Sequence, residues 1–168
     1  SNSYELPRVL GYNQNMIVRN FQIVEYETRY RDQIIKIVGK GLMELKVIPQ
    51  SNKPLEDEDL YQISEVYKNK GRFWVAIKED KVIGTVAIRD MGGNTAKLNR
   101  MFVLSNYHGK GVGQALFDHA IAFAKKQGYK EIILNTHFLM KRAHRFYEKN
   151  GFKQVRKEQD KYHYKMDL

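Results

Sequence analysis

Cysteine is absent from the 168 residues, proline occurs only three times, and no long apolar run is present. Without cysteine the chain forms no disulfide and has no cysteine nucleophile, which fits a reducing compartment. A membrane-spanning helix needs roughly 18 apolar residues, and no stretch approaches that length. The N-terminus also lacks a basic region followed by an apolar core. The sequence therefore predicts a cytoplasmic protein with no signal peptide and no membrane partner.

Recognisable metal and hydrolase motifs are missing as well. The histidines at positions 108, 119, 137, 144 and 163 show no His-Glu-x-x-His or comparable ligand spacing, so no metal site is expected. No Gly-x-Ser-x-Gly occurs, which argues against serine chemistry of the α/β-hydrolase type.

Positive charge is in excess. Lysine and arginine number 29 against 19 aspartates and glutamates, for a formal net charge of +10. A basic surface attracts nucleic acid, acidic protein or a phosphorylated cofactor alike, so the sign does not choose a partner. Nothing else in the sequence suggests nucleic acid, whose binding would weaken steeply with salt.

Polar residues without a clear period make up residues 1–15, which are expected to form a mobile leader before a single domain, residues 16–168. Period-two and apolar runs predict strands at 17–24, 73–78, 81–89, 96–104, 131–136, 152–158 and 162–167. Helical spacing predicts helices at 29–40, after Pro54, from Val112 to Gly128, and at 139–146.

This order predicts a mixed α/β (α+β) domain whose sheet is largely antiparallel, with a central β-α-β crossover and flanking helices. The apolar run 132–134 predicts a strand buried on both faces. The acidic run 56–59 is interpreted as the first turn of the helix opened by Pro54 rather than as a metal site.

The strongest local signal is the segment 104–114, in which glycines alternate at positions 109, 111 and 113 between a strand and a helix. Glycine lets the backbone approach a ligand closely and adopt positive φ. A helix start supplies unpaired N–H donors and partial positive charge. Together these features predict a site for phosphate oxygens, although a tight strand–helix turn alone would also use glycine.

Two familiar phosphate loops fit this segment poorly. A P-loop needs Ser or Thr after Gly-Lys, whereas Gly111 follows Lys110 and Leu104 stands where its first glycine belongs. The dinucleotide fingerprint Gly-x-Gly-x-x-Gly meets Gln114 or Leu116 at its third glycine. A nucleotide dehydrogenase is therefore not expected.

Two motifs give the chain a resemblance to the GCN5-related N-acetyltransferase (GNAT) superfamily. The family's loop, Arg/Gln-x-x-Gly-x-Gly/Ala, is similar to residues 108–113, and its Ala-x-x-[Leu/Phe]-Tyr-x-x-x-Gly-Phe stretch is matched by residues 143–152. Both stand in the family's order and spacing, and the element order agrees across about residues 16–168. The resemblance implies an acetyl-CoA-dependent N-acetyltransferase fold and activity.

The resemblance also implies roles for individual residues. The strand at Met101, Phe102 and Val103 would pair with the pantetheine arm of coenzyme A, and must diverge from strand 131–136 to leave a slot for the thioester. Tyr147 would act as the general acid that returns a proton to the leaving thiolate. The remaining implied cofactor-binding residues are His108, Gly109, Lys110, Gly111, Val112, Gly113, Gln114, Asn135 and Ala143.

Three departures from the family pattern stand out. His108 replaces the usual Arg or Gln, Met140 replaces an Asn common three residues before the alanine, and Lys97 stands where relatives often carry a glutamate base. The general base is therefore unassigned, with Asp90, Glu44 and His137 as candidates acting through water.

The expected acceptor is a primary amine of a small molecule or peptide, and the hairpin sequence resembles camello-type enzymes. Acetylation of a protein and non-catalytic coenzyme A binding are the alternatives. Relatives often pair, so a homodimer is a further expected partner.

Overall fold

The computed structural model describes residues 2–3 and 20–168 of the chain. One eight-stranded sheet has the order β1-β2-β3-β4-β5-β6-β8-β7, and β5–β6 is its single parallel pair among the described strands. The strands are β1 (Asn2–Ser3), β2 (Gln22–Glu25), β3 (Arg72–Lys78), β4 (Lys81–Asp90), β5 (Thr95–Val103), β6 (Glu131–His137), β7 (Lys153–Glu158) and β8 (Lys161–Asp167).

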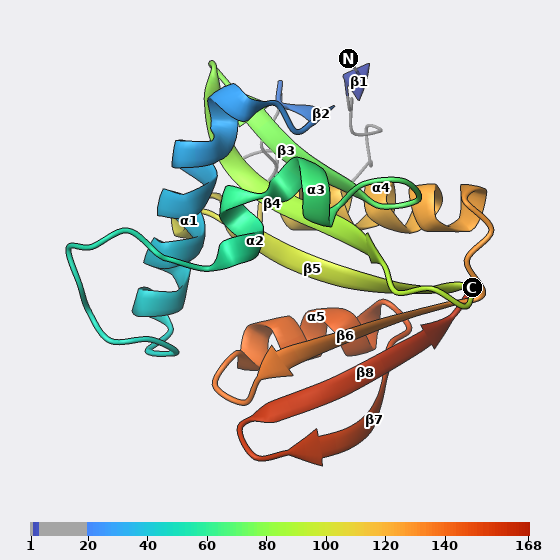
Figure 1. Cartoon of the computed structure of the whole chain (residues 1–168). Helices are drawn as coiled ribbons and strands as arrows, with labels where there is room; N and C mark the ends of the chain where they lie inside the picture. The colour runs from blue at the N-terminus through green and yellow to red at the C-terminus, as the bar shows by residue number, and fades with distance from the viewer. Residues whose placement is uncertain (1, 4–19) are drawn as a thin grey trace, which may run out of the picture.

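Helices cover both faces of this sheet. The α-helices are α1 (Arg31–Glu44), α2 (Glu58–Tyr61), α3 (Ile63–Val66), α4 (Val112–Lys126) and α5 (Lys141–Lys149), with short 3-10 turns η2 (Thr28–Tyr30) and η3 (Ser105–Tyr107). In Figure 1, α1, α2 and α3 lie in front of β3–β5, whereas α4 and α5 lie behind the sheet. The mixed sheet and the crossover β5–α4–β6 confirm the predicted fold class.

Several predicted boundaries need correction. Pro54 does not open a helix: α2 begins at Glu58 after the N-cap Asp57 and lasts one turn. The strand 131–136 is not buried on both faces, because burial alternates along β6 and Ile133 stays half-exposed. Leu139 precedes α5, which starts at Lys141.

The N-terminal segment is described only in part. Asn2–Ser3, within the expected leader, pair with β2 as β1, whereas residues 4–19 lie outside the described part of the chain. The first strand, expected at 17–24, is described from Gln22 to Glu25.

Two apolar clusters pack against opposite faces of the sheet. One joins α4 and α5 to the even-numbered side chains of β6, Ile132 and Leu134, and includes Tyr147. The other joins α1, α2 and α3 to β3 and β4. Strand alternation thus sends neighbouring side chains of β5 into different clusters, with Met101 behind the sheet and Phe102 in front.

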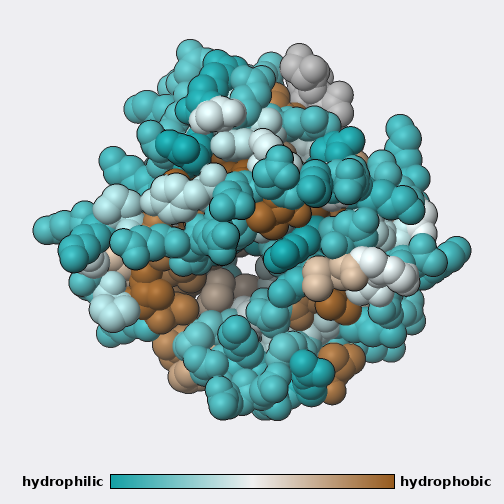
Figure 2. Space-filling view, in the orientation of Figure 1, coloured by the Kyte–Doolittle hydropathy of each residue, from teal (hydrophilic) through white to brown (hydrophobic). Residues whose placement is uncertain are grey.

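An opening in the sheet lies where β5 and β6 separate. Their backbones pair only through Thr95–Glu131, Ala96–Ile132 and Lys97–Ile133. Beyond that point β6 keeps β8 as its neighbour, while β5 diverges from it, as Figure 1 shows. The divergence confirms the expected splay of the Met101 strand. Figure 2 shows a hollow near the centre of this face, where the two strands part.

Candidate active site

The end of β5 presents unpaired backbone groups to the opening. The Leu104 N–H donates to the Ile83 carbonyl oxygen at 3.0 Å, so β4 and β5 are hydrogen-bonded at this pair. Because bonded and non-bonded pairs alternate along antiparallel strands, the N–H and C=O of Val103 point away from β4. Those groups face the side on which β6 no longer pairs with β5.

A bulge in β5 precedes this open end. Arg100 and Met101 together lie opposite Val86, because the register shifts between Thr85 and Ala87. Arg100 has a φ of 52°, and the Thr85 hydroxyl donates to its carbonyl oxygen at 2.6 Å. Even-numbered side chains point behind the sheet before the bulge (Ala96 and Leu98), and odd-numbered ones do so after it (Met101 and Val103).

The acidic run before β3 holds this bulge in place. The Arg100 guanidinium contacts the carboxylates of Asp57 and Asp59 at 2.7 and 2.6 Å, and Tyr67 donates its hydroxyl proton to Asp59 at 2.8 Å. Burial acts to raise the pKa of Asp59, but its bond to Arg100 and the Arg100 charge outweigh burial and lower it. Sequence reasoning missed this role, because Arg100 lies 41 residues beyond Asp59.

The glycine loop that follows β5 uses two left-handed positions. Gly109 has a φ of 70° and Gly111, the N-cap of α4, has a φ of 87°. Both conformations favour glycine. Gly113 is helical, and a Cβ there would lie 3.6 Å from Val103 Cγ2, an ordinary contact.

The first turn of α4 offers a set of free donors next to Val103. The Ala115 N–H closes the first helical bond, to Gly111 O at 3.1 Å, and no side chain among the described residues caps the N-terminus. The N–H groups of residues 112–114 therefore have no helical partner, and no acidic side chain lies in this turn. This end of α4 can hold an anion.

Two cations accompany this loop. Lys110 Nζ lies 5.9 Å from the centre of the Tyr107 ring. Arg142, from α5, places Nη2 4.0 Å from the position that a Cβ would take at Gly109. Among the described residues Arg142 has no carboxylate partner. It was missed at the sequence level, because its proximity depends on how α5 packs.

The His108 side chain turns back onto β5 instead of toward the helix start. Its Nε2 lies 2.8 Å from the Val103 carbonyl oxygen, which leaves the Val103 N–H as the open group. His108 is exposed. The predicted backbone contact of His108 with a cofactor stays a prediction.

Tyr147 lies in α5 with its ring in the cluster behind the sheet. Its ring centre is 5.7 Å from that of Phe152 and 6.4 Å from that of Tyr164. Only 8% of the residue is exposed, and burial raises the pKa of its hydroxyl well above 10. No described residue forms a hydrogen bond with this hydroxyl, whereas the Tyr164 hydroxyl donates to Glu148 at 3.1 Å.

The other predicted site residues lie around the same opening. Asn135, on β6, is two residues beyond the last pair with β5 and is half-buried. Ala143 follows Arg142 on α5 and packs against the cluster behind the sheet. Met140 is the N-cap of α5, and its side chain supplies no cap bond.

The three base candidates are not brought together. Asp90 accepts a bond from Gly92 N–H at the end where β5 and β6 are paired, away from the divergence. Glu44 contacts Lys40 at 3.9 Å on α1. His137 accepts from the Leu139 N–H through Nδ1, and its Nε2 lies 3.5 Å from Asp160.

A pocket of about 510 Å³ lies elsewhere, between β2 and α4, and is lined in part by Trp74 and His119. Its carboxylates are already paired, Glu25 with Arg72 and Glu27 with Arg29. Its lining residues do not include any of the glycine loop.

Within the described residues, no helix is long and apolar enough to cross a bilayer. The same residues contain no group of three or more histidines, aspartates or glutamates placed to hold a metal ion.

Comparison with known proteins gives concordant results. The model of the Acetyltransferase (GNAT) family matches residues 40–152. N-acetylaspartate synthetase of Xenopus tropicalis is 43% identical over 100 residues, which cover 58% of this chain and 37% of that protein. N-acetyltransferase 8B of Homo sapiens is 34% identical over 58% of this chain and 46% of its own length. The chain thus spans less than half of these relatives.

Solved structures extend the likeness to most of the chain. A GNAT-family acetyltransferase of Staphylococcus aureus Mu50 superposes with a TM-score of 0.79 at 26% identity, over 89% of this chain and 99% of that one. The PaiA N-acetyltransferase of Thermoplasma acidophilum, solved in complex with coenzyme A, has a TM-score of 0.72 at 21% identity, over 89% and 99% of the two chains. With the diverging strands and the uncapped glycine-lined helix, these matches show that the chain belongs to the GNAT acetyltransferase family.

Proposed function

We propose that this protein transfers the acetyl group of acetyl-CoA to a primary amine of a small molecule. The observation that carries the proposal is the unpaired Val103 N–H beside the uncapped first turn of α4. Two relatives are named for acetylation, N-acetylaspartate synthetase and N-acetyltransferase 8B, and the PaiA structure contains coenzyme A.

The free donors fit the parts of this cofactor in order along its length. The N–H groups of residues 112–114 suit the diphosphate, because they converge on one point and lie at the positive end of the helix dipole. Lys110 and Arg142 add positive charge at the loop. The Val103 N–H suits an amide carbonyl of pantetheine, as in strand addition. The divergence of β5 from β6 leaves room for the thioester.

Acetyl-CoA supplies a thioester that an amine can cleave directly. The amine nitrogen bonds to the carbonyl carbon as the carbon–sulfur bond breaks, the nitrogen loses one proton, and the sulfur gains one. The Tyr147 hydroxyl, kept protonated by burial, is the proposed donor to the sulfur. No described residue is assigned to the proton leaving the nitrogen.

Thermal unfolding with added ligands tests the cofactor assignment. Acetyl-CoA at 100 times its Kd should raise the unfolding free energy by about 2.7 kcal/mol, while NAD and ATP at equal concentration should not. A shift with NAD or ATP and none with acetyl-CoA would refute the proposal. Release of free thiol from acetyl-CoA, measured with a panel of amines, then separates an enzyme from a module that only binds the cofactor.

A further inference from the structure

The front face of the sheet, opposite to α4 and α5, carries cationic side chains from β4, β5 and β8 around the opening. The register sets Arg89 opposite Lys97 and Lys97 opposite Ile133, so these side chains share one face. On β8, Lys161 lies opposite His137, whose side chain points to the same face as that of Ile133. Figure 1 shows no helix in front of β6 and β8.

Three of these cations lack an anionic partner. Arg100 is paired with Asp57 and Asp59, and Lys165 is paired with Glu131 at 2.8 Å. Within the described chain, no carboxylate oxygen approaches Arg89, Lys97 or Lys161 to within 4.0 Å. Glu158, the register partner of Lys161, instead contacts Arg156 and His163.

Repulsion among these cations destabilises the protein when no anion is bound. Like charges directly opposite each other in a sheet are destabilising, as Arg89 and Lys97 are. Lys97 is also half-buried: burial lowers its pKa, and the charges of Arg89, Lys161 and Arg100 lower it further. The charge of Asp59 acts in the opposite sense, and this carboxylate is already held by Arg100.

We infer that this face selects an acceptor that carries a carboxylate beside its primary amine, and that Lys97 and Lys161 hold the carboxylate. The inference rests on the proposed acetyl transfer and specifies its substrate class. A bound carboxylate offsets the repulsion between the two lysines and leaves the amine near the opening between β5 and β6. A polyamine would place further cations against cations and is disfavoured.

The specificity is tested by comparing matched amines as acceptors. Aspartate, its diamide (in which both carboxylates are replaced by carboxamides) and 1,4-diaminobutane are compared as acceptors at saturating acetyl-CoA. The kcat/KM for aspartate should exceed that for either alternative by about tenfold or more, since one lost charge contact of about 1.4 kcal/mol is a factor of ten. Equal or better use of the diamide or the diamine overturns the anionic class. That outcome would leave the proposed transfer of the acetyl group to an amine unaffected.

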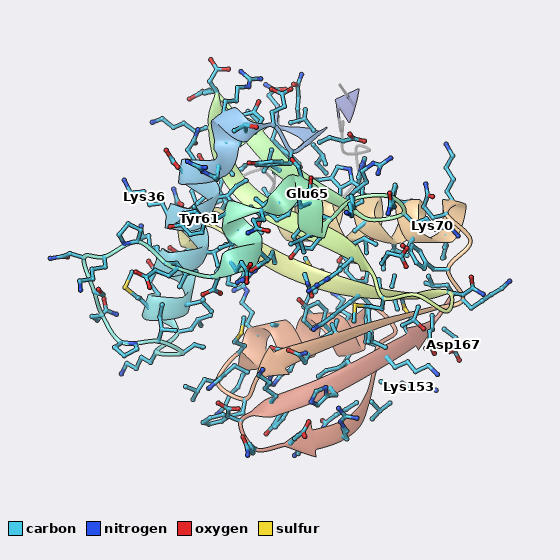
Figure 3. The ribbon with its side chains drawn as sticks, in the orientation of Figure 1. Lys36, Tyr61, Glu65, Lys70, Lys153 and Asp167 are labelled. Atoms are coloured by element: carbon cyan, nitrogen blue, oxygen red, sulfur yellow. The ribbon has the colours of Figure 1, made fainter. Side chains whose placement is uncertain are left out.

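Variants identify the residues that bind the carboxylate. Lys97→Gln and Lys161→Gln should each raise the KM for aspartate about tenfold, with a smaller change for the diamide and none in the KM for acetyl-CoA. Lys36→Gln is the matched control, because Lys36 is exposed on α1, away from β6 and β8, in Figure 3. A fall in kcat that is equal for all acceptors would instead make Lys97 a proton acceptor and refute its role as an anchor.

Binding without turnover provides an independent readout. Protein saturated with coenzyme A is titrated with aspartate while amide chemical shifts are followed by NMR. Saturable shifts on β5, β6 and β8 that Lys97→Gln abolishes support the inference. Their absence at millimolar aspartate overturns it, whereas failure to bind acetyl-CoA at all would refute the proposed function instead.

Discussion

At the scale of single residues, Tyr147 combines a buried ring with a hydroxyl that no described group binds. Tyr147→Phe should lower kcat about 100-fold while leaving the Kd for acetyl-CoA unchanged, since only a proton donor is removed. Burial raises the Tyr147 pKa, so the hydroxyl keeps its proton and its ionisation should not reduce wild-type kcat below about pH 10. Steady-state kinetics across pH measures both effects.

A neighbouring tyrosine provides the control for this variant. Tyr164→Phe removes a hydroxyl that donates to Glu148 and should cost stability, about 1 kcal/mol, with kcat retained. If both variants lost kcat equally, packing rather than proton donation would explain the Tyr147 result.

Arg142 is the cation that α5 brings to the glycine loop. Arg142→Ala should weaken coenzyme A binding about tenfold, because a charge contact to phosphate is lost. The loss should shrink as salt rises, since Arg142 is exposed. Calorimetric titration at two salt concentrations measures this. Lys149→Ala, seven residues and about 10 Å further along α5, should bind as the parent does; an equal loss there would indicate a general charge effect.

At the scale of elements, the start of α4 allows affinity and stability to be separated. Gly113→Glu adds a carboxylate to the first helical turn, where a Cβ meets only ordinary contacts. The variant should be more stable by about 1 kcal/mol, because glycine is replaced and the charge suits the helix dipole. Its affinity for acetyl-CoA should fall about 100-fold, since the carboxylate competes for the phosphate site. Urea unfolding and calorimetric titration give the two values.

A neutral isostere distinguishes charge from bulk at this position. Gly113→Gln should bind acetyl-CoA better than Gly113→Glu does. A folded Gly113→Glu protein that bound as tightly as the parent would contradict the assignment of the helix start. Gly111 is less suitable for this test, because its φ of 87° strains any side chain placed there.

The link between the acidic run and the β5 bulge predicts a pH dependence. The net lowering of the Asp59 pKa means that the folded chain binds protons there less readily than the unfolded chain. This contribution to stability is present above about pH 4 and is lost as the pH falls below it. Asp59→Asn should cost about 2 kcal/mol at pH 7 and less near pH 3. Urea unfolding at both pH values measures the gap, and a gap independent of pH would contradict the ion pair.

At the scale of the whole molecule, the sequence predicted those features of the fold that local sequence patterns determine. Glycines, turn residues and apolar periods located the hairpin, the crossover and helix α4. Long-range pairing was not accessible in this way: Arg100 meets an acidic run 41 residues earlier, and Arg142 meets a loop on another element. Ile133 looked buried because its neighbours are apolar, yet no helix covers its face of the sheet.

The three backbone pairs between β5 and β6 are few compared with the seven between β6 and β8. A cofactor bound between the diverging strands would bridge the two parts of the sheet. Acetyl-CoA should therefore slow amide exchange at Val103, at residues 112–114 and along β6, because local opening then requires ligand release. Hydrogen exchange followed by NMR, with and without acetyl-CoA, measures this. Protection confined to the glycine loop, with β6 unchanged, would place the thioester outside the opening.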